Sequence, residues 1–151
     1  MYTLVRRYIK TSLLFFLVGL ALGVWIMWKG YWGDPAGMSV VISAHTHVIL
    51  IGFIITLIMG IAYWMFPRPA REDYRYSPNM AEVNYWLVTG GTVVRLYGEM
   101  WQYASDGAHG IIWAAIGAGA QTLAGVVFAW NIWSRVRPIG SDKREAKGER
   151  F

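Results

Sequence analysis

The sequence predicts an all-α integral membrane protein built as a four-helix, up-down unit. Hydrophobic residues make up 56% of the 151 residues and charged residues only 15%, whereas soluble domains have about 45–50% and about 25%. Four apolar segments are long enough to cross about 30 Å of hydrocarbon as helices. Only helices and closed barrels satisfy all backbone polar groups in lipid, and segments this long are not barrel strands.

Turn-forming and charged residues separate the expected spans, which are residues 11–32, 39–66, 85–103 and 110–133. The stretch 33–37, GDPAG, is a turn cluster between the first two spans. Pro67 and Pro69 end the second span because proline cannot continue a helix ladder. The third span is the most polar, since Arg95 and Glu99 lie inside it. Connections of this kind favour antiparallel neighbours, which gives the up-down order.

The chain has the length of a single domain, which we place at residues 1–137. Residues 138–151 form a basic, polar tail that is expected to be disordered. All of the 14 Lys and Arg residues except Lys29 and Arg95 lie on one side of a four-span protein. The positive-inside rule therefore places both termini in the cytoplasm, as in a multi-pass protein of a prokaryotic inner membrane.

Two histidines, His45 and His47, lie near the start of the second span, which is apolar after them. Ionisable groups at this depth are costly and are functional candidates, although they can also simply hydrogen-bond to neighbouring helices or interfacial water. Neutral imidazole is the commonest protein ligand for transition metals. Residues i and i+2 lie about 200° apart on a helix, so one helix cannot easily aim both rings at one ion. The spacing therefore predicts two separate sites, or one site shared with a neighbouring copy.

Residues 44–67, AHTHVILIGFIITLIMGIAYWMFP, resemble the tenth helix of the catalytic subunit of haem-copper oxidases, cytochrome c oxidase subunit I. That helix also begins Ala-His-x-His, has a glycine after Ile-Met and ends with a tryptophan near Phe-Pro. Nitric oxide reductases belong to the same superfamily. In the family, the first histidine binds the high-spin haem and the second binds the low-spin haem, on opposite sides of the helix. The resemblance therefore implies b-type haem, with His45 and His47 as ligands of the iron.

The family's catalytic subunit has twelve spans in three arcs of four, whereas this chain has four spans with the histidines on the second. The resemblance therefore implies that three copies can rebuild the twelve-helix ring as a closed C3 trimer. His45 of one copy would then face His47 of the next and share a haem. The sequence has no second histidine cluster, so no copper or non-haem iron site is identified.

Three other ionisable residues are candidates near the same level. Arg95 and Glu99 are spaced i, i+4, which suits a mutually neutralising ion pair. Alternatively, Arg95 would reach the haem propionates, and Glu99 would serve a proton path or a hydrogen bond to a histidine. His109 begins the fourth span and is either an axial ligand or an interfacial histidine.

The function expected from the resemblance is electron transfer by a bis-histidine haem, since iron with two histidines has no open position. The expected partners are the lipid bilayer, other copies of the chain, and a quinol or a periplasmic cytochrome, with the haem toward the outer face; nucleic acid is not an expected partner. One alternative is a haem enzyme or sensor for NO or O₂, so whether the chain is an oxidoreductase stays open. Another alternative is a cofactor-free accessory or assembly subunit of a respiratory complex.

Overall fold

The structure is a computed structural model that describes residues 2–33, 37–66, 77–105, 108–133, 135–136 and 148. Its elements are α1 (Tyr2–Trp32), α2 (Met38–His47), the π-helix η1 (Val48–Ile55), α3 (Thr56–Met65), α4 (Pro78–Ser105) and α5 (Ala108–Trp133). The predicted all-α fold is confirmed for these residues. The predicted turns around 34–36 and 67–76 and, apart from residue 148, the predicted tail lie outside the described residues.

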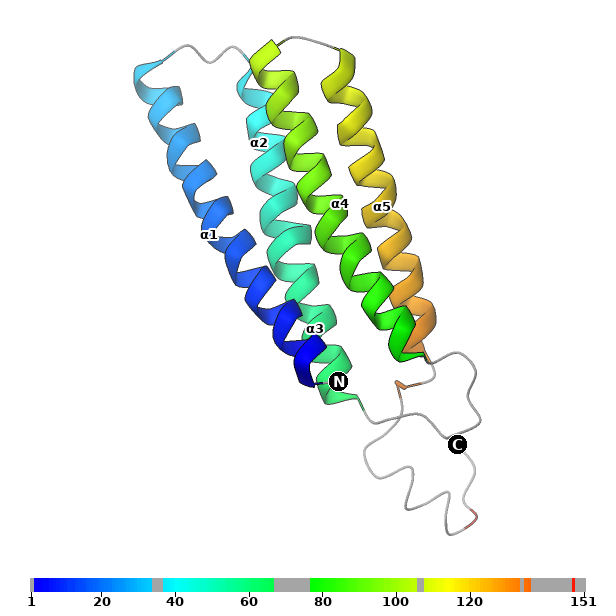
Figure 1. Ribbon diagram of the computed structural model, residues 1–151. Coiled ribbons are helices and arrows are strands. Elements are labelled where there is room, and N and C mark those ends of the chain that lie inside the picture. Colours follow the sequence, from blue (N-terminus) through cyan, green and yellow to red (C-terminus); the bar gives the residue numbers. More distant parts are fainter. Residues whose placement is uncertain are drawn as a thin grey trace.

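Four helical rods run up and down beside one another, because α2, η1 and α3 follow end to end as one rod (Figure 1). We call the end of the bundle where α1 ends and α2 begins the histidine end. The opposite end, where α1 begins, is called the N-terminal end. The rods overrun the predicted spans: α1 begins at Tyr2 and α4 at Pro78, since helices continue through the polar residues that flank an apolar segment.

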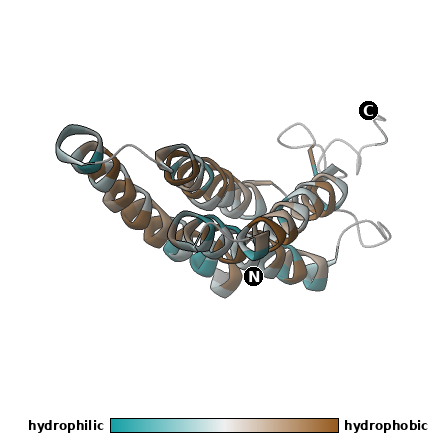
Figure 2. Ribbon diagram, turned by 90° about the horizontal axis from the view of Figure 1, so that it is seen from above, coloured by the Kyte–Doolittle hydropathy of each residue, from teal (hydrophilic) through white to brown (hydrophobic). Residues whose placement is uncertain are grey.

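Three of the four rods are long and apolar enough to cross a membrane, namely Thr3–Trp32, Met38–Met65 and Ala108–Trp133. Much of the helical ribbon has the brown colour of hydrophobic residues (Figure 2). The remaining helix, α4, has 28 residues but is too polar to meet the same criterion. Four of its polar side chains are instead buried against other helices: Asn84, Thr89, Thr92 and Glu99. The third span was expected to be the most polar of the four, which agrees with this finding, and its helical state is confirmed.

Helices α4 and α5 form the most extensive helix pair because glycines let their backbones approach closely. A Cβ atom added at Gly117 of α5 would lie 2.6 Å from the carbonyl oxygen of Gly91 of α4. A Cβ atom at Gly119, two residues further along, would meet nothing within 4 Å. The two glycines thus mark the packed face and the open face of the same helix.

Replacing Gly117 with alanine is expected to lower the free energy of unfolding by about 1–3 kcal/mol, the usual cost of overpacking. The methyl group would push against the backbone of α4, which cannot move aside as a flexible side chain would. Gly119→Ala is the matched control and is expected to be neutral or slightly stabilising, since alanine is the better helix former. Unfolding of both variants in detergent, followed by circular dichroism, measures the difference. Equal stability of the two variants would contradict this close packing.

Aromatic and polar contacts hold the N-terminal end together. The ring centroid of Tyr8 lies 5.7 Å from that of Tyr63 and 5.1 Å from that of Tyr85. The Tyr8 hydroxyl donates to the carbonyl oxygen of Ala81 over 3.1 Å. Arg135, which follows α5 and is 1% exposed, donates to the carbonyl oxygen of Tyr63 over 3.1 Å. These contacts join α1, α3, α4 and the segment after α5. All of them lie at the N-terminal end, away from the histidines.

The π-helix η1 begins directly after His47 and interrupts the α-helical spacing of the second rod. At its end, the Thr56 amide and hydroxyl both donate to the carbonyl oxygen of Ile51, five residues earlier. Gly52 in η1 faces Phe15 and Thr92, and an added Cβ atom would lie 2.9 Å and 3.0 Å from their side chains. Such π-helical turns are frequent at functional sites, and this one lies next to the histidines.

Candidate functional site

His45 points from α2 toward α1. Its Nδ1 atom lies 2.9 Å from the carbonyl oxygen of Gly19. Gly23, one turn further along α1, leaves room for the ring, because an added Cβ atom would lie 3.2 Å from the His45 Cε1 atom. Gly19 thus supplies the carbonyl acceptor for His45, and Gly23 supplies the space for its ring.

His47 points toward α4, on another side of the same rod. Its Nδ1 atom lies 2.8 Å from the carbonyl oxygen of Ser43 and 3.3 Å from the Ser43 hydroxyl. The carboxylate oxygen Oε1 of Glu99 on α4 lies 3.6 Å from the same nitrogen. The two rings therefore face different helices, as the i, i+2 spacing predicts.

The hydrogen bonds determine which nitrogen of each ring is free. A carbonyl oxygen only accepts hydrogen bonds, so Nδ1 carries the proton in the neutral form of both His45 and His47. This leaves the lone pair on Nε2 in each ring. Among the described residues, the hydrogen bonds of both rings use Nδ1 and none uses Nε2. Each neutral ring therefore has the Nδ1–H tautomer, in which Nε2 can accept a hydrogen bond or bind a metal.

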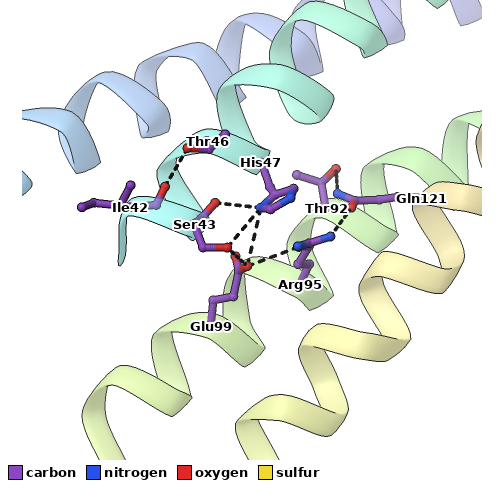
Figure 3. Close-up of polar contacts among 8 residues, drawn as sticks. All are labelled: Ile42, Ser43, Thr46, His47, Thr92, Arg95, Glu99 and Gln121. Atoms are coloured by element: carbon purple, nitrogen blue, oxygen red, sulfur yellow. Dashed lines mark hydrogen bonds and ion pairs between the residues drawn. The ribbon is translucent and has the colours of Figure 1, made fainter. Parts of the chain in front are cut away.

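A polar network extends from His47 across α4 to α5 (Figure 3). Ser43 donates its hydroxyl proton to Glu99 Oε1 over 2.7 Å, and Arg95 Nε donates to the same oxygen over 3.3 Å. Arg95 also donates to the Gln121 side chain of α5 over 3.4 Å, and Gln121 donates to the Thr92 hydroxyl over 3.1 Å. The predicted ion pair of Arg95 with Glu99 is therefore present, and it lies beside His47.

The Glu99 carboxylate is only partly satisfied by this network. Its side chain is 6% exposed. Oxygen Oε1 receives the contacts of Ser43, Arg95 and His47, whereas Oε2 is buried and has no hydrogen-bond partner among the residues the structure describes. A buried oxygen without a partner is uncommon and calls for an explanation.

His109 is not part of this network. It is exposed in the first turn of α5, and it forms no hydrogen bond or ion pair with another described residue. Helix α5 packs mainly on α4, which separates it from the histidines of α2. The described ranges also contain no group of three or more His, Asp or Glu side chains placed to hold a metal ion.

Sequence reasoning missed several residues that position these side chains. Ser43 lies four residues before His47, so the spacing rule for helix neighbours was sufficient to find it. Gly19 and Gly23 show the same spacing on α1, but nothing in the sequence indicates that His45 packs there. Gln121 carries no sequence signal, because its role depends on the pairing of α4 with α5.

Comparison with known proteins places the chain in a family. The family model described as cytochrome c and quinol oxidase polypeptide I matches residues 3–146. No curated protein and no solved structure matches the chain. The match confirms the resemblance seen in residues 44–67 and extends it over nearly all of the chain. The chain therefore belongs to the cytochrome c and quinol oxidase polypeptide I family, the haem-copper oxidase subunit I family.

Proposed function

We propose that this protein is a membrane-bound b-type haem protein that transfers single electrons, with His45 and His47 as axial ligands of the iron. Members of its family normally bind haem. The observation that carries the proposal is the pair of Nδ1–H···O=C bonds, which leave the Nε2 lone pairs of both rings free. Hydrogen bonding of the second ring nitrogen to a carbonyl group is the usual arrangement of metal-bound histidine.

The residues present fit a haem better than a metal ion held by side chains alone. A haem iron takes only one or two axial ligands from the protein, because the porphyrin supplies the others. The described residues offer two such histidines and no larger group of ligands. When bound, the haem supplies a one-electron redox centre, and two histidines on its iron would leave no open position for a substrate. This favours electron transfer over catalysis on NO or O₂.

We further propose that each haem lies between two copies of the chain in a C3 trimer. His45 and His47 of one copy face different helices and cannot both ligate one iron. In a ring, His45 of one copy can meet His47 of the next, which gives a heterologous interface that closes. Helices α1 and α5 lie at opposite edges of the bundle (Figure 1).

Each of the two edge helices carries an apolar groove. An apolar groove of about 540 Å³ runs along α1 and is lined by Val24, Met27, Trp28, Tyr31 and Trp32. A second apolar groove, of about 450 Å³, runs along α5 and is lined by Val126, Ala129, Trp130 and Trp133. The first groove lies at the histidine end and the second at the N-terminal end, so the two grooves would not meet each other in a ring and carry no argument for the trimer.

The proposed location is a prokaryotic inner membrane with both termini in the cytoplasm. In this orientation α4 also crosses the bilayer, since it lies alongside the three apolar rods (Figure 1). The histidine end then faces outward, within reach of a quinol or a periplasmic cytochrome. Arg95 keeps a second proposed role, contact with a haem propionate, besides its ion pair with Glu99.

Absorption spectroscopy of the detergent-purified protein tests the proposed function. We expect sharp low-spin b-type bands after reduction with dithionite, and no change in these bands when carbon monoxide is added. A shift with carbon monoxide would favour a haem enzyme or a gas sensor, because it requires an open position on the iron. A colourless protein purified from haem-replete cells would overturn the proposal in favour of an accessory subunit.

A further inference from the structure

We propose that Glu99, acting through Ser43, holds the reduction potential of the haem on His47 at a low value. This inference rests on the proposed function, because it concerns the electronic environment of an axial ligand. It assigns Glu99 and Ser43 as positioning residues that act on the iron through the His47 ring without touching it.

Three oxygen atoms surround the Nδ1–H group of His47 (Figure 3). The carbonyl and hydroxyl oxygens of Ser43 lie 2.8 Å and 3.3 Å from Nδ1, and Glu99 Oε1 lies 3.6 Å away. The Ser43 hydroxyl uses its proton in the 2.7 Å bond to Glu99, so it presents only lone pairs to the imidazole. The ring N–H therefore meets two acceptor oxygens of Ser43, with a carboxylate oxygen close beside them.

This environment favours the oxidised state of a metal on the opposite ring nitrogen. Acceptors on Nδ1–H raise the basicity of Nε2 and strengthen its bond to the metal. The carboxylate is buried, and charges interact more strongly there than in water. Ferric haem carries one positive charge more than ferrous haem, so the carboxylate stabilises the ferric form and lowers the potential. A cation held by His47 would also provide favourable charge near Glu99, whose Oε2 has no hydrogen-bond partner among the described residues.

The two histidines differ in this respect. His45 donates to the neutral carbonyl of Gly19 on α1, and no described carboxylate forms an ion pair with it. His47 is the ring with a carboxylate beside it. The alternative role of Glu99 is only to neutralise Arg95 within the helix bundle. Ser43→Ala separates the two roles, because it keeps the ion pair of Arg95 with Glu99 and removes the hydroxyl bridge to His47.

The test is a redox titration of the haem-loaded protein at one pH, followed by absorption spectroscopy. We expect Glu99→Gln to raise the midpoint potential by about 59 mV, which corresponds to a tenfold change in the ferrous-to-ferric ratio. Glu82→Gln is the matched control, since Glu82 lies on the same helix but is exposed and paired with Arg7. This control is expected to keep the wild-type potential. Glu99→Asp, which keeps the charge, is expected to stay closer to wild type than Glu99→Gln.

Ser43→Ala provides a second route if Glu99→Gln fails to fold. It keeps the backbone acceptor of His47 and removes the hydroxyl bridge, so a smaller rise in potential is expected. An unchanged potential in haem-loaded Glu99→Gln, or in haem-loaded Ser43→Ala, would overturn the role of Glu99 acting through Ser43. A wild-type protein without haem would instead overturn the proposed function, and this inference with it.

Discussion

Replacing either His45 or His47 with alanine is expected to abolish the low-spin haem spectrum. Each ring offers a free Nε2 atom that the other ring cannot replace, because the two face α1 and α4 respectively. Loss of one axial ligand leaves an iron that is high-spin or a protein that does not retain haem. Reduced-minus-oxidised spectra and the ratio of haem to protein measure this loss directly.

His109→Ala is the matched control for these variants. His109 is exposed at the start of α5 and lies outside the polar network around His47. We expect this variant to keep the wild-type spectrum and haem content. If one of the α2 variants kept its low-spin bands while His109→Ala lost them, the axial pair would include His109, and the shared site would be wrong.

Co-expression of the His45→Ala chain with the His47→Ala chain is expected to restore part of the haem that each lacks alone. In the proposed ring, a site is intact when a copy with His45 precedes a copy with His47. Random mixing in a closed trimer gives this order at about one quarter of all interfaces, which is about one third of the interfaces in the trimers that contain both chains. Two different affinity tags select the mixed oligomers, and their haem content is compared with that of the wild type.

The control for this experiment pairs the His45→Ala chain with a chain that lacks both histidines. No copy in that mixture supplies His45, so no haem is expected. If the tagged mixed oligomers of the first experiment also lacked haem, sharing between copies would be refuted. Co-purification with only one tag would show that the chains do not assemble, which also contradicts the trimer.

Much of the fold follows from local sequence properties. Long apolar segments and the positions of turn residues predict the helices, because each helix satisfies its own backbone hydrogen bonds. The polar α4 is less clear from hydropathy, since Glu99 and Asn84 are buried by neighbouring helices that the sequence does not reveal. The π-helix was not predicted at all. Its Gly52 packs against Phe15 and Thr92, both distant in the chain, so the surroundings of η1 are set by tertiary contacts.

For the candidate site too, relations within one helix could be predicted from the sequence, whereas contacts between helices could not. Helical geometry predicts that His45 and His47 face different sides, and that Arg95 pairs with Glu99, because both relations lie within one helix. The contact of His45 with α1 and of His47 with Glu99 required the tertiary structure. These contacts assign the ring protons, and this assignment supports the haem proposal.

The position of η1 links the length of this π-helix to the direction in which His45 and His47 point. A π-helical turn holds an extra residue, so the segments before and after it follow two different angular registers. Residues through His47 obey one register, whereas Met59 and Tyr63, which are buried in the core of the N-terminal end, obey the other. Lengthening or shortening η1 by one residue would therefore rotate the histidines relative to that core without altering its packing. The span behaves as two joined rods, and re-aiming the histidines would also turn the buried Met38, Val41 and Ala44 of α2.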